Sequence, residues 1–360
     1  MKLLHTGDWH VGKTLRGRSR AEEHRDVLAE IAALAREHAV DFVLVAGDLF
    51  DTNAPTPESE TLVYRALLDL RETGAQVAII SGNHDNPRRL GAVKPLLDIG
   101  GVHTAHEVRR PDEGGVLRLE AKDGAALHLG FLPFLSKRNI VKAAELMTKD
   151  ADEHAGEYAE RAEAVIRALT AKLDPGAAHV LLAHGMVHGG VMGGGERSAH
   201  TVFEYSIPST AFPAGLHYVA LGHLHRAQKI PGACPVWYSG SPLQLDFGET
   251  ENPSSVNLIE ASPGKPAEVV QVPLTAGRRL RRVEGSLQAL EAMADEAREI
   301  LPNAVEVRVK SRERTGKKKT ERRIGRAHDE LFAEYLESRD VDDPALVALF
   351  RELLDEAETS

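Results

Sequence analysis

The sequence predicts an α/β fold in which two sheets form a sandwich flanked by helices, with a small α/β capping domain and C-terminal helices. Three observations predict it. Apolar runs alternate with amphipathic segments through the first hundred residues, further apolar runs follow beyond residue 175, and the charge changes sharply after Pro273. Alternation of strands and helices is typical of a largely parallel sheet.

The first hundred residues have the order βαβαβ. Residues 2–6 and 42–46 are short apolar runs typical of buried strands, and residues 77–80 repeat the pattern. Residues 22–38 carry apolar side chains at i, i+4, i+7 and i+8, as an amphipathic helix does, and a second helix is expected near residues 57–73. This order predicts neighbouring parallel strands.

The second half contains more strand than helix. Residues 116–134 read as antiparallel strands and residues 139–173 as helix, while residues 180–183 and 218–221 are further apolar runs. Short β-rich runs fill residues 235–274. We expect these runs to form a second sheet packed on the first.

A polar cluster follows each of five apolar runs, where the strand is expected to end. Ligands of open α/β sheets lie beyond the carboxyl ends of strands, so clusters far apart in sequence can converge on one site. Glycines at these ends suit tight turns, in which the backbone approaches closely or takes a positive φ. The clusters are Gly7-Asp8-Trp9-His10, Gly47-Asp48, Gly82-Asn83-His84-Asp85, His184-Gly185 and Gly222-His223-Leu224-His225.

The side chains of these clusters are carboxylates, an amide and imidazoles, which are ligands that divalent ions take from proteins. Two ions bridged by one carboxylate stabilise the attacking and leaving oxygens of an in-line displacement at phosphorus. Asp48 stands alone at the end of a central strand and is the expected bridge. In the Asp8-x-His10 and His223-x-His225 patterns, alternate residues lie on one side of the chain. Any one of these residues alone is more often a cap or a packing group, but five clusters together favour a metal site.

Length and composition narrow the class of protein. The 360 residues predict one dominant domain over residues 1–275 and two smaller attachments, residues 276–326 and 327–360. One cysteine, Cys234, excludes an internal disulfide and a cysteine-rich zinc module, and favours a reducing compartment. There is neither an 18-residue apolar run nor a signal-peptide pattern at the N-terminus, so we expect a cytoplasmic protein.

The end of the chain differs in charge from the rest. Residues 278–326 hold 15 Lys or Arg against 8 Asp or Glu, a net charge of +7, so the other 311 residues carry −17. The basic segment suits contact with a phosphate backbone without sequence preference, and a solvated surface is the alternative. Within it, residues 280–283, 287–301 and 305–309 read as strand, helix and strand. Residues 346–354 form an apolar helical stripe, which either docks on a partner or packs on its own domain.

Taken together, the motifs resemble those of calcineurin-like metallophosphoesterases. That family's pattern is D-x-H, G-D, G-N-H-D/E, H and G-H-x-H, and all five blocks occur here in order. More narrowly, four segments are similar to the SbcD-type nucleases: HTGDWHVGK at 5–13, AGDLFDTNAP at 46–55, SGNHDNPRRL at 81–90 and LGHLHRAQ at 221–228. The resemblance is strong over residues 1–275 and weak beyond them.

The resemblance implies a division of roles. His84 would contact the scissile phosphate without binding metal, and would stabilise the transition state or protonate the leaving oxygen. Asp85 would orient His84, with helix capping as the alternative. Asp51 stands where archaeal and eukaryotic members have a second functional histidine, and either acts near the phosphate or caps the next turn. Two ligand sets sharing one residue are implied: Asp8, His10, Asp48 and His225 for the first ion, and Asp48, Asn83, His184 and His223 for the second.

The resemblance also implies a reaction and partners. It implies a metal-dependent DNA exonuclease and endonuclease that uses two divalent ions, with Mn²⁺ favoured, and forms a homodimer. Its partner would be an SbcC-type coiled-coil ATPase, in DNA end processing, repair and recombination; the chain itself has no P-loop for ATP. The residues expected to touch DNA are Arg88, Arg89, Arg226, Lys317, Lys318 and Lys319.

Two alternatives stay open, because a metal site alone does not name the substrate. One is a phosphatase or cyclic-nucleotide phosphodiesterase that acts on small substrates. The other is a noncatalytic DNA-binding scaffold subunit built on the same fold. The basic segment and the C-terminal extension favour the nuclease over the first, and the complete set of ligands favours it over the second.

Overall fold

The computed structural model describes residues 1–136, 140, 158–196 and 206–285, and the backbone of residues 304–309. The chain divides into two compact units, Met1–Val309 and Lys310–Ser360, and the described residues all belong to the first. The predicted helix at 287–301 and everything predicted beyond residue 309 lie outside the described residues. Among the residues that are described, no helix combines the length and the apolar character needed to cross a membrane.

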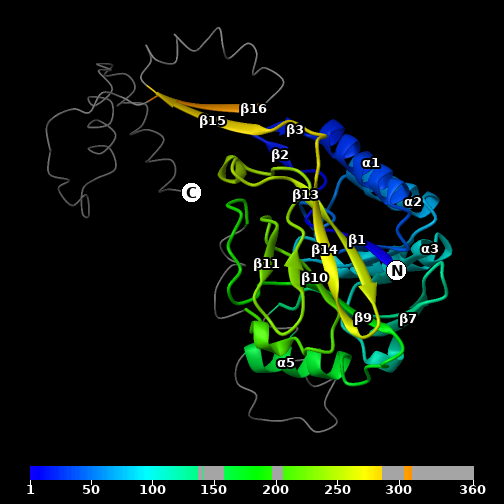
Figure 1. Cartoon of the computed structure of the whole chain (residues 1–360). Coiled ribbons are helices and arrows are strands. Elements are labelled where there is room, and N and C mark those ends of the chain that lie inside the picture. Colours follow the sequence, from blue (N-terminus) through cyan, green and yellow to red (C-terminus); the bar gives the residue numbers. More distant parts are fainter. Residues whose placement is uncertain (137–139, 141–157, 197–205, 286–303, 310–360) are drawn as a thin grey trace, which may run out of the picture. The chain divides into compact units, whose positions relative to one another are not determined.

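Two six-stranded sheets form the centre of the first unit (Figure 1). The first has the strand order β14-β13-β1-β4-β5-β6. β13 (Ser255–Ser262) runs antiparallel beside β1, and β14 (Lys265–Pro273) runs antiparallel beside β13. The other strands are parallel, as the βαβαβ pattern predicts: β1 (Lys2–Thr6), β4 (Phe42–Val45), β5 (Gln76–Ile80) and β6 (Val102–Ala105).

The second sheet has the order β11-β12-β10-β9-β8-β7. Its edge strands β7 (Val116–Glu120) and β11 (Gln228–Ile230) are antiparallel to their neighbours, which confirms the antiparallel pair predicted at 116–134. The four inner strands are parallel: β8 (Ala126–Leu132), β9 (Ala178–His184), β10 (Tyr218–Gly222) and β12 (Val236–Tyr238).

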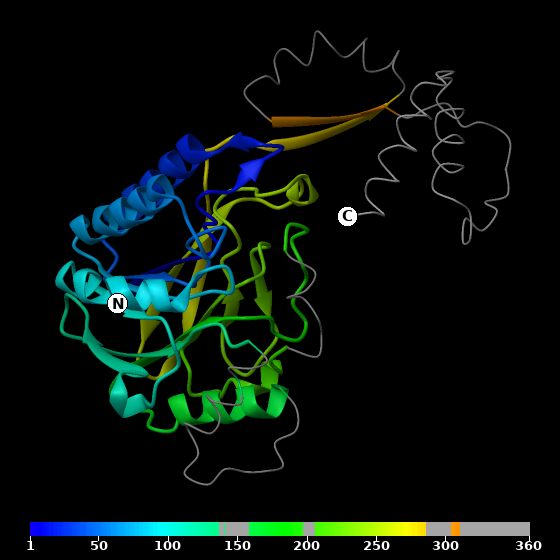
Figure 2. The ribbon, with the colours of Figure 1, turned by 180° about the vertical axis from the view of Figure 1, so that it is seen from behind.

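Helices cover the outer face of each sheet (Figure 2). α1 (Ala21–Glu37), α2 (Pro57–Glu72) and α3 (Pro87–Ile99) share one apolar core with the first sheet. α5 (Tyr158–Leu169) packs on the second sheet. The helices predicted at 22–38 and 57–73 are confirmed, and α5 confirms the described part of the helix predicted at 139–173.

A third apolar core lies between the two sheets. Leu3, Leu44 and Ile80 point from the first sheet toward Leu129 and Leu182 on the second. The alternate residues of the same strands face the helices, so both faces of each central strand are buried. This explains why the strands appear in the sequence as unbroken apolar runs. Each buried leucine contributes about 1.5–3 kcal/mol to folding.

One prediction about the sheets is wrong in detail. Residues 235–274 do not make up the second sheet: β12 joins it, but β13 and β14 extend the first. The second sheet is instead built around β8, β9 and β10. The apolar pattern of a strand shows that it is buried and does not show which sheet it joins, so the sequence could not assign them.

Smaller elements complete the first unit. β2 (Thr14–Leu15) and β3 (Arg18–Ser19) form a hairpin after the first polar cluster, and single turns of 3₁₀ helix lie at Pro111–Glu113, Ser209–Ala211 and Phe247–Glu249. β15 (Leu280–Gly285) pairs in parallel with β16 (Ala304–Val309), which confirms the strands predicted at 280–283 and 305–309.

Helix caps fix the loops that follow β4 and β5. The hydroxyl of Thr56 accepts a hydrogen bond from the Ser59 amide, and Pro57 opens α2. Asn86 accepts from the amides of Arg88 and Arg89 and so begins α3. Both caps limit the freedom of loops whose polar residues lie at the carboxyl edge of the first sheet.

Candidate metal centre

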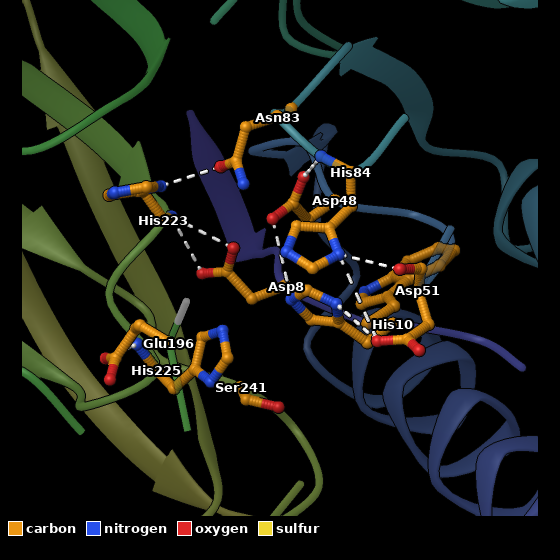
Figure 3. A network of polar contacts seen from close by, with 12 residues as sticks. Asp8, His10, Asp48, Asp51, Asn83, His84, Glu196, His223, His225 and Ser241 are labelled. Atoms are coloured by element: carbon orange, nitrogen blue, oxygen red, sulfur yellow. Dashed lines mark hydrogen bonds and ion pairs between the residues drawn. The ribbon is translucent and has the colours of Figure 1, made fainter. Parts of the chain in front are cut away.

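The five polar clusters meet at the carboxyl ends of β1, β4, β5, β9 and β10 (Figure 3). The structure therefore brings together all seven residues that the sequence nominated as ligands. Asn83 is half-buried and the other six are buried: Asp8, His10, Asp48, His184, His223 and His225. The first three clusters along the chain follow strands of the first sheet and the last two follow strands of the second, so the site lies across the edge of the sandwich.

One group of possible ligands comprises Asp8, His10 and His225, each with a ligand atom within 4.8 Å of the others. The Asp8 carboxylate accepts hydrogen bonds from the His223 amide at 2.9 and 3.0 Å, which joins the first sheet to the second at this point. This group matches the first ligand set implied by the family resemblance, apart from the shared aspartate.

A second group lies beside it. Nε2 of His184 is 2.9 Å from the side-chain oxygen of Asn83. Nδ1 of His223 is 2.7 Å from the same oxygen, a contact drawn in Figure 3. Asp48 joins this group through its carboxylate, 3.6 Å from Nε2 of His184. The second implied ligand set is therefore also assembled.

Asp48 stands between the two groups. The same oxygen that faces His184 lies 3.5 Å from Nε2 of His10, and the other carboxylate oxygen accepts a hydrogen bond from the His84 amide at 2.8 Å. A carboxylate placed between imidazoles of both sets has the position that a bridging ligand requires.

The donor set fits divalent ions. Neither ring nitrogen of His10 makes a well-formed hydrogen bond, although the ring is buried, and unpaired buried nitrogens are costly unless a ligand completes them. Nδ1 of His184 donates to the Ala46 carbonyl at 2.6 Å, which leaves Nε2 unprotonated for a metal. The mixed N and O donors are compatible with Mn²⁺, Fe²⁺ or Zn²⁺.

The backbone at this site is strained. Asp8, His10, Asp48 and His223 all take positive φ, between 48° and 111°, which is uncommon for residues with a Cβ and costs on the order of 1–3 kcal/mol each. Such conformations turn the chain sharply at the strand ends and aim the side chains into one place. Gly82 is needed for a related reason, because a Cβ there would collide with the Asp48 carboxylate.

Burial and neighbouring charge shift the pKa values of the site residues. Burial raises the pKa of Asp8 well above its usual value, and the nearby Asp48 carboxylate adds to this effect. Burial lowers the pKa of His10 well below its usual range. Burial also works to lower the pKa of His225, but a hydrogen bond with Glu249 overrides it and raises that pKa to about 9. The buried carboxylates repel one another, and this repulsion favours a site filled by cations.

His84 lies beside the ligands and makes contacts that orient its ring. Its Nδ1 is 2.7 Å from the Asp51 carbonyl, and its ring meets that of His10 edge to face, with centroids 4.5 Å apart (Figure 3). Only 8% of His84 is exposed. The imidazole is thus held beside the buried ligand cluster.

The alternative that Asp85 caps α3 is wrong, because Asn86 is the cap. That Asp85 orients His84 stays a prediction. The Asp85 carboxylate accepts hydrogen bonds from the amides of Gly82, Leu49 and Phe50 at 2.9 to 3.3 Å. Burial, with Asp48 adding to it, raises the pKa of Asp85 to about 7. Asp85 therefore ties together the two loops that carry Asp48 and Asn83.

Asp51 contacts the site through its carboxylate. One oxygen lies 3.5 Å from Nδ1 of His10, 3.4 Å from the Lys13 ammonium and 4.0 Å from Nδ1 of His84. Although burial opposes it, contact with these groups lowers the pKa of Asp51, which keeps the residue ionised. Its position behind His10 favours a supporting role at the site over the alternative of capping α2, whose cap is Thr56.

Two glutamates near His225 could not be found from the sequence. Glu249 is 1% exposed, and its carboxylate lies 2.7 Å from Nδ1 of His225. Glu196 accepts hydrogen bonds from the amides of His225, Gly193 and Gly194. Neither glutamate belongs to a motif or follows an apolar strand, so no sequence signal distinguishes them from surface acids.

The predicted DNA-contacting arginines are placed differently from one another. Arg89 forms an ion pair with Glu60, with N–O distances of 2.7 and 2.8 Å, so its guanidinium is already engaged. Arg88 is exposed at the start of α3, and Arg226 is exposed next to His225. The three lysines that were also predicted to contact DNA lie outside the described residues: Lys317, Lys318 and Lys319.

Comparison with known proteins agrees with this geometry. Residues 1–227 match the family model described as calcineurin-like phosphoesterase. The chain is 34% identical over 307 residues to the SbcD subunit of the nuclease SbcCD from Bacillus subtilis (strain 168), which covers 83% of this chain and 76% of that protein. The SbcD subunit from Rhodobacter capsulatus is 34% identical over 317 residues, covering 84% and 77%, and that from Escherichia coli (strain K12) is 29% identical over 311 residues, covering 83% and 75%. The chain thus belongs to the calcineurin-like phosphoesterase family and, within it, groups with the SbcD subunits of SbcCD nucleases.

Proposed function

We propose that this chain is a metal-dependent phosphodiester hydrolase that cleaves DNA as an SbcD-type nuclease subunit. The observation that carries the proposal is the position of the Asp48 carboxylate, within 3.6 Å of an imidazole from each of two ligand groups. Such an arrangement suits a pair of ions that act together on one phosphodiester.

The proposed ligand sets keep the assignment made above. Asp8, His10 and His225 would hold the first ion, and Asn83, His184 and His223 would hold the second, with Asp48 contributing to both sets. Bound ions would supply positive charge to the phosphate and lower the pKa of the attacking water. Mn²⁺ is the proposed metal, on the basis of the resemblance to the family.

The chain's own residues position the substrate. The Asp51 carbonyl fixes the ring of His84 by a hydrogen bond to Nδ1, and the packing of His10 against that ring restricts its rotation. With a second proton on Nε2, His84 in this orientation would donate a hydrogen bond from that nitrogen to a phosphate oxygen or protonate the leaving oxygen. A reaction of this kind needs no covalent enzyme intermediate.

DNA is the proposed substrate for two reasons. Relatives at 34% identity are named as nuclease subunits. Arg226 is exposed and directly follows the proposed ligand His225, and Arg88 is exposed at the start of α3. The basic segment 278–326 would extend this positive surface, and we keep residues 276–326 as a proposed capping domain. A cytoplasmic location is proposed because the single cysteine, Cys234, is a free thiol.

The partners are also proposals. The relatives are named as subunits of SbcCD, so we propose an SbcC-type ATPase partner for this chain, docked by the helices of residues 327–360. A homodimer is supported by an exposed apolar cluster on α2 and α3: Leu68, Leu96 and Ile99 are 42%, 70% and 85% exposed. A Cβ on Gly100 would lie 3.5 Å from the Leu68 side chain, so Leu68 lies beside the C-terminal end of α3, which carries Leu96 and Ile99.

The decisive experiment compares two substrates in wild-type and His84→Gln protein. With Mn²⁺, wild type should cleave end-labelled linear DNA and also bis(p-nitrophenyl) phosphate, whereas His84→Gln should bind Mn²⁺ as wild type does and cleave neither efficiently. Cleavage of the small diester without cleavage of DNA would favour a phosphodiesterase of small substrates. Undiminished DNA cleavage by His84→Gln would remove this residue from the mechanism.

A further inference from the structure

A loop beside the metal centre carries two exposed apolar side chains. We call residues 189–196, Gly-Gly-Val-Met-Gly-Gly-Gly-Glu, the rim loop. At its tip, Val191 and Met192 are 53% and 50% exposed. Single exposed apolar residues are common on protein surfaces, so their exposure alone indicates nothing. Two further observations suggest a role for these side chains: the backbone of the loop is fixed by hydrogen bonds, and the loop contacts His225.

The rim loop is tied down on both sides of its tip. The Gln228 side chain accepts from the Val191 amide at 2.8 Å and donates to the Val191 carbonyl at 2.7 Å, as a neighbouring strand would. After the tip, Glu196 accepts from the amides of Gly193 and Gly194. The side chains of Val191 and Met192 therefore project from a fixed backbone.

The same bonds fix the loop to a proposed metal ligand. Glu196 also accepts from the His225 amide at 3.0 Å, and a Cβ on Gly193 would lie 3.0 Å from Cβ of His225. Gly193 itself is buried, and Asn252 donates to its carbonyl. Met192 is the residue directly before Gly193, whose backbone packs against His225.

A duplex end presents surfaces that match this tip. The proposed ligands are almost fully buried. Taking a nucleotide out of a duplex stack costs a few kcal/mol. Proteins that unstack DNA use apolar side chains as wedges between bases. Arg226 is exposed and follows His225 directly, so a cation for the phosphate backbone lies on the same rim.

We propose that Val191 and Met192 form an apolar wedge that packs on the terminal base pair of duplex DNA and unstacks it beside the metal centre. This inference rests on the proposed nuclease function. It makes the rim loop a determinant of substrate structure: the wedge matters for a duplex end and not for DNA that is already single-stranded.

The test uses the full-length chain with Val191 and Met192 both changed to Ser, and Val270→Ser as the control, because Val270 is 62% exposed on β14. The DNA is a blunt duplex with 2-aminopurine as its terminal base and phosphorothioate linkages that resist cleavage. Wild type and Val270→Ser should raise the fluorescence of 2-aminopurine on binding, as an unstacked base does. The double variant should bind within about twofold of wild type and produce no such rise.

Cleavage measurements separate this inference from the proposed function. The double variant should cleave an unmodified blunt duplex about tenfold more slowly, the loss expected when about 1.4 kcal/mol of stacking is removed, and should cleave the single strand at the wild-type rate. An equal fluorescence rise in the double variant, or a fall in bis(p-nitrophenyl) phosphate hydrolysis, would overturn the wedge. Met192→Ser alone repeats the test if the double variant folds poorly, and an equal fluorescence rise in that variant would overturn the wedge in the same way. Wild type that hydrolyses the small diester but no DNA would instead contradict the nuclease function itself.

Discussion

The Glu249 carboxylate lies 2.7 Å from Nδ1 of His225, and both side chains are buried. A second carboxylate oxygen of Glu249 accepts from the Leu245 amide at 2.7 Å, so the glutamate is itself fixed. A carboxylate that receives the Nδ1 proton of a histidine sets its tautomer and makes Nε2 a better ligand. The contact between Glu249 and His225 should therefore strengthen binding of the proposed first ion by His225.

Replacing Glu249 with Gln should therefore weaken binding of the first ion. Loss of such a supporting contact typically costs about 10- to 100-fold in metal affinity. Titration calorimetry with Mn²⁺ would measure it, with Glu251→Gln as the matched control because Glu251 is exposed. Equal affinities in the two variants would show that Glu249 serves only the fold.

Asp48→Asn tests the bridging carboxylate. The amide keeps the shape and can still accept from the His84 amide, but it removes the charge that faces His10 and His184. Small-diester hydrolysis should fall roughly 10³-fold, equivalent to several kcal/mol of lost stabilisation. Steady-state rates with saturating Mn²⁺ check this. Asp69→Asn, in an exposed pair with Arg65, should leave the rate unchanged, and a comparable loss there would discredit the assignment.

The apolar cluster on α2 and α3 predicts a change in oligomeric state. Charges placed at Leu96 and Ile99, by the double change to Glu, would have to be desolvated in any interface that covers these residues. Light scattering with size exclusion should report a dimer for wild type and a monomer for the variant. Hydrolysis of the small diester should persist in that monomer, and a dimer that survives the change would place the interface elsewhere.

His5 predicts a pH dependence of stability. The ring is fully buried beside Tyr218, and burial lowers its pKa from 6.5 to about 3. The unfolded chain takes up a proton on His5 below pH 6.5 and the folded chain does not, so its contribution is complete above pH 6.5 and is lost as the pH falls toward 3. The free energy of unfolding in urea should fall by up to about 1.4 kcal/mol per pH unit on this account. His5→Gln should show a shallower dependence between about pH 7 and 5, and an unchanged slope would refute the prediction.

The residues that follow α1 and α2 predict opposite changes in stability when alanine is replaced by glycine at one of them and glycine by alanine at the other. Ala39 follows α1 with φ 49°, and Gly74 follows α2 with φ 84° and has no neighbour that a Cβ would meet. Glycine suits this left-handed position after a helix. Ala39→Gly should stabilise the fold by about 0.5–1 kcal/mol and Gly74→Ala should destabilise it by a similar amount. Thermal or urea unfolding measures both, and shifts of the same sign would contradict the explanation.

The convergence of the proposed ligands could be predicted from the sequence because each lies at the end of a buried strand or within a few residues after it. Asp48 and His184 are two examples: both end apolar runs, and parallel strands bring their carboxyl ends to one edge. The order βαβαβ was likewise visible in the periodicity of residues 1–100. Local pattern and strand direction were sufficient for these features.

Other features depend on contacts between distant segments that leave no local trace. Glu249 lies 24 positions after His225, in a loop without a motif. β13 pairs with β1 although almost the whole described chain separates them, and its apolar pattern would suit either sheet. Asp85 belongs to a recognisable motif, but its hydrogen bonds to the amides of Leu49 and Phe50 could not be inferred from it. Sequence indicated the chemistry of these residues and not their partners.

The proposed ligands of each ion come from both sheets, since Asp8 and His10 follow β1 whereas His225 follows β10. A bound ion would therefore act as a removable cross-link between two halves of the sandwich, closing a loop of more than two hundred residues; Asp8 and His223 alone are 215 positions apart. An ion that binds the folded centre and not the unfolded chain raises the free energy of unfolding. Hydrogen exchange of the backbone amides of β1 and of β10 should then slow together when Mn²⁺ is added, because a bound ion would link ligands that come from both sheets.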